Sequence, residues 1–88
     1  MDNLDPLPSI LTQLEELAFR LGVDVRYEAF GEDIEQSQGG LLRLKDRHII
    51  LVNVEKSLEE QVKTLIKALR QFDIDDLYVR PALRDLLT

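Results

Sequence analysis

The spacing of apolar residues changes twice along this 88-residue chain, and each change marks a switch between helix and strand. Over residues 10–21 they recur at intervals of three and four, which is the spacing of one face of an α-helix. Over residues 23–29 they alternate with charged residues, as in a strand with one buried face. Gly22 lies between the two patterns and suits the left-handed conformation that ends many helices. The pattern predicts a helix followed directly by a strand.

A β-hairpin is predicted from residues 41–44 and 48–54, which flank Lys45 and Asp46. We expect Asp46 to supply the positive φ angle of the tight turn, and Gly39-Gly40 to form a bend or bulge before the hairpin. A two-residue turn places one set of alternating side chains on a single face: Leu41, Arg43, His48, Ile50 and Val52. The last strand is apolar on both faces, so it is expected to be central or to be covered by another molecule.

A second helix is predicted to begin at Ser57-Leu58-Glu59-Glu60, because this sequence forms a capping box. Its apolar stripe continues to Phe72, with charged residues outside the stripe. The segment from Asp73 to Asp76 interrupts the pattern, and Pro81 opens a short C-terminal helix.

These elements predict an α+β fold with the order α-β-β-β-α-α. The expected architecture is a three-stranded, mostly antiparallel sheet with the two main helices packed on one face and the short C-terminal helix beside them. Pro6 and Pro8 predict an extended lead-in over residues 1–8, with Ser9 capping the first helix. A single domain is therefore expected over residues 9–88.

The composition indicates in which cellular compartment the chain is expected to lie and which classes of partner it disfavours. Cysteine is absent, which is typical of the reducing cytoplasm, and the first residues lack the pattern of an export signal. The longest apolar run is far below the roughly 20 residues that cross a bilayer, so no membrane segment is expected. The net charge of −6 disfavours nucleic acid as a partner.

The sequence contains no recognisable catalytic, metal-binding or cofactor-binding set. His48 is the only histidine and has no nucleophile motif near it, and a zinc site would need more nitrogen or sulfur ligands than the chain offers. The acidic run at Asp73 resembles the start of a calcium loop but has Tyr78 and Arg84 where that loop needs Gly and Glu. We therefore expect no cofactor, no metal and no catalytic residues, and we identify no small-molecule ligand.

The order helix, strand, hairpin ending Ile50-Leu51-Val52-Asn53, and Ser-capped helix resembles the core of ImmA/IrrE-type zincin metallopeptidases over residues 10–72. In that family the helix carries the zinc motif His-Glu-x-x-His, which falls here on Lys67-Ala68-Leu69-Arg70-Gln71. The resemblance implies a degenerate zincin-like fold in which Lys67, Ala68 and Gln71 replace the first metal ligand, the general base and the second ligand. The chain also resembles a group of small bacterial proteins of unassigned function, through the segments Gly39-Gly40-Leu41-Leu42-Arg43-Leu44, Ile50-Leu51-Val52-Asn53 and Phe72-Asp73-x-Asp75-Asp76.

The sequence favours a non-catalytic protein-interaction or regulatory module over an enzyme. A protein partner or a second copy, giving a homodimer, is expected to cover the face formed by Leu41, Arg43, His48, Ile50 and Val52. The alternative is an enzyme with a metal-dependent site built from carboxylates such as Glu32, Asp33 and Asp75.

Overall fold

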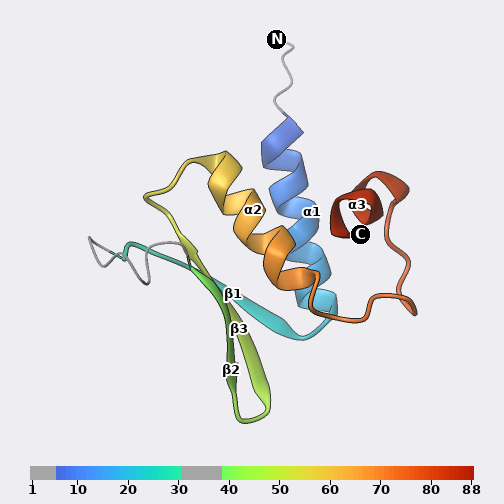
Figure 1. Cartoon of the computed structure of the whole chain (residues 1–88), viewed down its shortest axis with the longest axis horizontal. Coiled ribbons are helices and arrows are strands. Elements are labelled where there is room, and N and C mark those ends of the chain that lie inside the picture. The colour runs from blue at the N-terminus through green and yellow to red at the C-terminus, as the bar shows by residue number, and fades with distance from the viewer. Residues whose placement is uncertain (1–5, 31–38) are drawn as a thin grey trace.

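The structure is a computed structural model that describes residues 6–30 and 39–88. Its elements follow the order α1 (Pro6–Arg20), β1 (Val23–Glu28), β2 (Gly40–Leu44), β3 (Arg47–Asn53), α2 (Leu58–Leu69) and α3 (Pro81–Leu87). The predicted α+β class and element order are confirmed. Figure 1 shows α1 and α2 side by side next to the sheet, with α3 on the other side of α1. None of the described helices is long and apolar enough to cross a membrane.

The sheet is mixed, with the strand order β1-β3-β2. β3 pairs parallel with β1 and antiparallel with β2, so the expected predominance of antiparallel pairing is corrected to one pair of each kind. β3 is apolar on both faces and takes the central position, as predicted. Because it lies between two strands that run in opposite directions, one of its two pairings has to be parallel.

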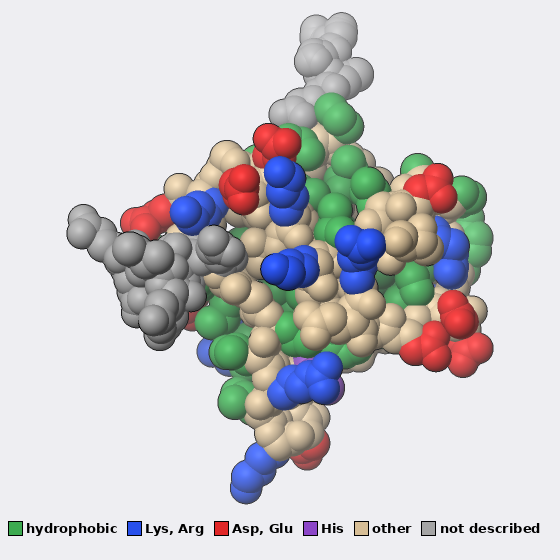
Figure 2. Space-filling view, viewed as in Figure 1, with side chains coloured by type: hydrophobic (Ala, Val, Ile, Leu, Met, Phe, Trp, Pro, Cys, Tyr) green, Lys and Arg blue, Asp and Glu red, His purple; other side chains and the backbone are tan. Residues whose placement is uncertain are grey.

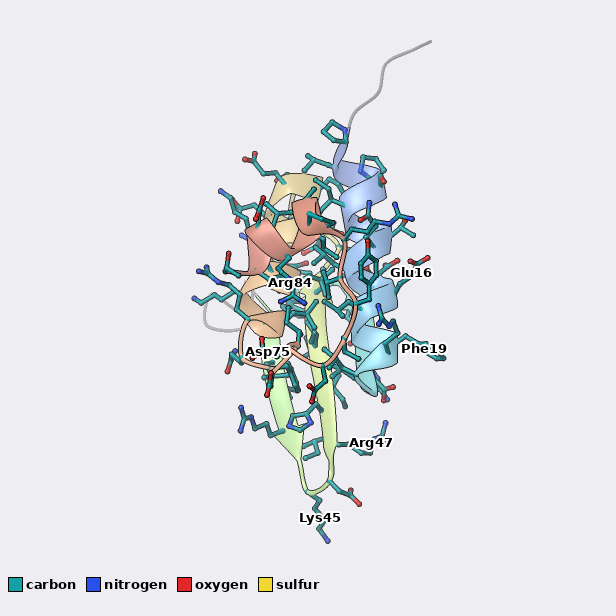
Figure 3. The ribbon with its side chains drawn as sticks, turned by 90° about the vertical axis from the view of Figure 1, so that its right-hand side faces the viewer. Glu16, Phe19, Lys45, Arg47, Asp75 and Arg84 are labelled. Carbon is teal, nitrogen blue, oxygen red and sulfur yellow. The ribbon has the colours of Figure 1, made fainter. Side chains whose placement is uncertain are left out.

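The hairpin has the expected two-residue turn, since Leu44 pairs with Arg47 across Lys45 and Asp46. The positive φ angle falls on Lys45, at 41°, and the prediction of Asp46 is wrong. Figure 3 shows Lys45 at the tip of the hairpin, pointing away from the helices.

The first helix begins at Pro6, so the predicted lead-in to residue 8 and the cap at Ser9 are wrong. The amides of the first helical turn have no partner within the helix, so a proline can occupy this turn without loss of a hydrogen bond. Ser9 lies inside α1, where its hydroxyl accepts a hydrogen bond from Nε2 of Gln13 at 3.2 Å. The domain therefore includes residues 6–8, and residues 1–5 lie outside the described residues.

The core lies between the sheet and the two main helices, which pack on the same face as predicted. Its fully enclosed members come from both helices and from the sheet, and include Leu14 of α1, Ile50 of β3 and Leu65 of α2. The connection from α2 to α3 adds Ile74 and Val79, and α3 adds Leu83 and Leu87. One hydrophobic core therefore joins all the described elements.

Arginine side chains hold the irregular connection between α2 and α3. The Arg84 guanidinium donates to the carbonyl oxygen of Leu77 at 3.1 Å, and Arg20 of α1 donates to that of Tyr78 at 2.8 Å. Figure 3 shows Arg84 within the arc of this connection. Carbonyl groups outside regular structure thus gain charge-assisted hydrogen bonds.

Tyr27 of β1 is expected to make the stability of the fold decrease in alkali. Burial raises its pKa, as do its hydrogen bond to Glu15 and the charge of that carboxylate. A raised folded-state pKa gives a contribution that is fully present below about pH 10, the ordinary tyrosine value, and is lost as the pH rises further. Tyr27→Phe should therefore flatten the decrease, to an extent reduced by solvent screening. Urea unfolding between pH 8 and 11 measures this, and equal slopes for the two proteins would refute it.

Candidate functional site

A groove of about 320 Å³ lies between the edge strand β2 and helix α2. We call it the β2–α2 groove. Its lining comes from the start of β2, from the loop before α2 and from one side of α2 and the turn after it: Gly39, Gly40, Leu41, Lys56, Glu60, Lys63, Thr64, Lys67, Ala68 and Gln71. The α2 residues recur at intervals of three and four, so they share one face of the helix. Helical periodicity thus brings them to the same wall.

The sheet side of the groove is formed largely by bare backbone. At Gly39 the φ angle is 75°, and a Cβ atom there would lie 2.2 Å from the carbonyl oxygen of Leu51 on β3. Only glycine fits this close approach, which agrees with the predicted bend. β2 is an edge strand, so part of its backbone N–H and C=O groups face away from the sheet. Within residues 6–30 and 39–88, β2 therefore pairs with a strand on one side only.

The helix side of the groove is positively charged, although the whole chain carries a net charge of −6. Lys56, Lys63 and Lys67 line it, against one carboxylate from Glu60. Lys63 lies 3.9 Å from Glu59 in an exposed pair, which is a weak interaction. Within residues 6–30 and 39–88, neither Lys56 nor Lys67 forms an ion pair. Figure 2 shows basic side chains gathered over α2 on the face turned to the viewer.

The three positions that the zincin resemblance assigns to the metal ligands and the base all line this groove. Lys67 and Ala68 belong to the last turn of α2, and Gln71 follows the end of the helix. Together they offer an ammonium group, a methyl group and a neutral amide. This set repels a cation and cannot accept a proton from water, so it suits contact with an anionic or polar ligand.

The predicted partner interface is wrong for Ile50 and Val52, because both are fully buried in the core. Leu41 also packs against that core. The alternation of side chains along the strands correctly predicted that these residues share one face of the hairpin. That face, however, is the one that α1 and α2 cover. Arg43 is exposed and His48 is half-buried, with its ring 5.2 Å from that of Phe72 in an edge-to-face contact.

The opposite face of the hairpin carries the exposed apolar side chains. Leu42 and Leu44 keep 43% and 49% of their surface accessible. If a second copy covers part of the sheet, these two residues are the available contacts, in place of the buried set.

The carboxylates of the alternative enzyme site are not brought together in the part of the chain that the structure describes. Glu32 and Asp33 lie outside it, and Asp75 lies in the α2–α3 connection, where its amide donates to the Asp73 carboxylate at 2.9 Å. Within the described ranges, no group of three or more His, Cys, Asp or Glu side chains is placed to hold a metal ion.

Sequence reasoning missed the β2–α2 groove. Its signals were present as Gly39-Gly40 at the start of a strand and as lysines four residues apart on the polar side of α2. No family model matches this chain, and neither curated proteins nor solved structures gave a significant match.

Proposed function

We propose that this chain is a non-catalytic protein-interaction module that binds an extended peptide segment in the β2–α2 groove. The observation that carries the proposal is an edge strand, β2, which has a strand neighbour on one side only among the described residues and whose start lines a groove with bare backbone at Gly39 and Gly40. An extended segment can add to such an edge through main-chain hydrogen bonds, while the facing helix selects its side chains.

The side chains at the end of α2 favour binding without cleavage. A zincin hydrolyses peptides because unprotonated ligands hold a metal ion that acidifies water, and a nearby carboxylate takes the proton. Here Lys67 contributes a positive charge and Ala68 a methyl group to the same groove. We therefore propose a degenerate zincin-like module in which a peptide-binding groove is kept and the hydrolytic groups are absent.

We expect a randomised library of blocked nine-residue peptides to yield binders that occupy this groove. Amide chemical-shift changes should concentrate at residues 39–42 and 60–71. Methylating one backbone nitrogen of a binder that donates to β2 should weaken binding by up to about tenfold, because a lost hydrogen bond costs roughly 0.5–1.5 kcal/mol. The bound peptide should be recovered intact after prolonged incubation.

Three results would contradict this proposal. The first is a library that yields no binder, and the second is a set of shifts that map to another surface. The third is cleavage of the peptide that a chelator abolishes, because it would restore the hydrolase interpretation. The measurements should be made where sedimentation shows a single copy, since pairing of two β2 edges would compete for the same site.

A further inference from the structure

The two lysines that α2 contributes to the groove have a spacing that matches an extended chain. Lys63 and Lys67 are four residues apart on one helix face. Four residues advance an α-helix by about 6 Å, and two residues advance a strand by about 6.6 Å. Alternate side chains of a strand also point to the same side. Carboxylates at positions i and i+2 of an extended peptide would therefore meet the two ammonium groups in register.

We infer that the β2–α2 groove selects protein segments that carry Asp or Glu at alternate positions. The inference rests on the proposed function and specifies its partner. Lys56, in the loop before α2, supplies a third positive charge. Glu60 is the groove's own carboxylate, and it disfavours registers that place an acidic side chain beside it.

The lysines in the groove and the acidic residues elsewhere on the chain together favour a short acidic peptide over a nucleic acid as the ligand. The Debye length at physiological ionic strength is about 8 Å, so the lysines act on a ligand within the groove while the distant acids are largely screened. A long polyanion extends beyond the groove over a surface with a net charge of −6 and loses this advantage. The local field therefore favours a peptide segment.

The test compares three blocked peptides of equal length. One has Glu at alternate positions separated by Thr, one has the same residues with the Glu in a block, and one has Gln in place of Glu. An exposed ion pair is worth up to about fivefold in affinity, so the alternating peptide should bind about 5- to 25-fold more tightly than its Gln counterpart. This advantage should shrink as salt is raised from 50 to 300 mM.

Two single substitutions that remove the same charge provide the matched comparison. Lys67→Gln should reduce the affinity for the alternating peptide by up to about fivefold, and should reduce the affinity for the Gln peptide by less. Lys45→Gln, at the hairpin tip away from α2, should change neither affinity. Adding Lys63→Gln to Lys67→Gln should remove most of the preference for carboxylates.

The outcomes separate the inference from the proposed function. Equal binding of the Glu and Gln peptides in the groove would overturn charge selection and leave the peptide site intact. Equal binding of the block and alternating peptides would overturn the spacing rule. An oligonucleotide of equal charge that displaces the alternating peptide would overturn the assignment to a protein partner. If neither the Glu nor the Gln peptide shifted the groove amides, the proposed function would fail together with the inference.

Discussion

Leu65→Ala is expected to lower the free energy of unfolding by about 2–5 kcal/mol. Leu65 is fully buried in the core formed by the two main helices and the sheet, so the shorter side chain leaves a cavity. A domain of 88 residues has roughly 4–13 kcal/mol of stability at 0.05–0.15 kcal/mol per residue. The substitution therefore removes a large fraction of the total, and urea unfolding at 25 °C measures it.

Leu44→Ala provides the control, because it makes the same chemical change at a residue that keeps 49% of its surface exposed. We expect a loss within about 0.5 kcal/mol, as for most surface substitutions. A loss as large as that of Leu65→Ala, increasing with protein concentration, would mean that a second copy buries this face of the hairpin. The pair of variants thus tests both the core and self-association.

The elements were predictable because their signals are local. Helical and strand periods follow from the backbone geometry of a few residues, and the predicted cap of α2 is confirmed, since the Ser57 hydroxyl accepts a hydrogen bond from the Glu60 amide at 3.2 Å. The start of α1 was mispredicted because a proline pair is compatible with both an extended segment and a first helical turn. Gly22, with a φ angle of 77°, ends α1 as its position indicated.

Strand direction and the covered face were not predictable from these local signals. The alternation of Ile50 and Val52 is the same whether helices or a partner cover them, and it does not encode the parallel pairing with β1. The β2–α2 groove was not predictable for the same reason. Lys63, Lys67 and Gly39 are separated along the chain, and their chemistry combines only when β2 and α2 meet beside the core.

Gly39→Ala is expected to destabilise the fold by about 2–5 kcal/mol and to damage the groove at the same time. The left-handed conformation costs a non-glycine residue about 1–2 kcal/mol, and forced overpacking adds about 1–3 kcal/mol. The overlap here is with the backbone carbonyl of Leu51, 2.2 Å from the new Cβ atom, and a backbone group cannot move aside as a side chain can. β2 must therefore shift away from β3.

Gly22→Ala separates the two causes, because Gly22 has almost the same φ angle and a Cβ atom added there would meet no atom within 4 Å. We expect it to cost only the conformational term, about 1–2 kcal/mol, and to leave peptide affinity unchanged. Gly39→Ala should lower peptide affinity even at temperatures where circular dichroism shows both variants to be folded, because the displaced edge strand forms one wall of the groove. Equal losses of stability, with peptide binding intact in both variants, would show that β2 does not hold Gly39 against β3 as described. The peptide site would then have to lie elsewhere on the molecule.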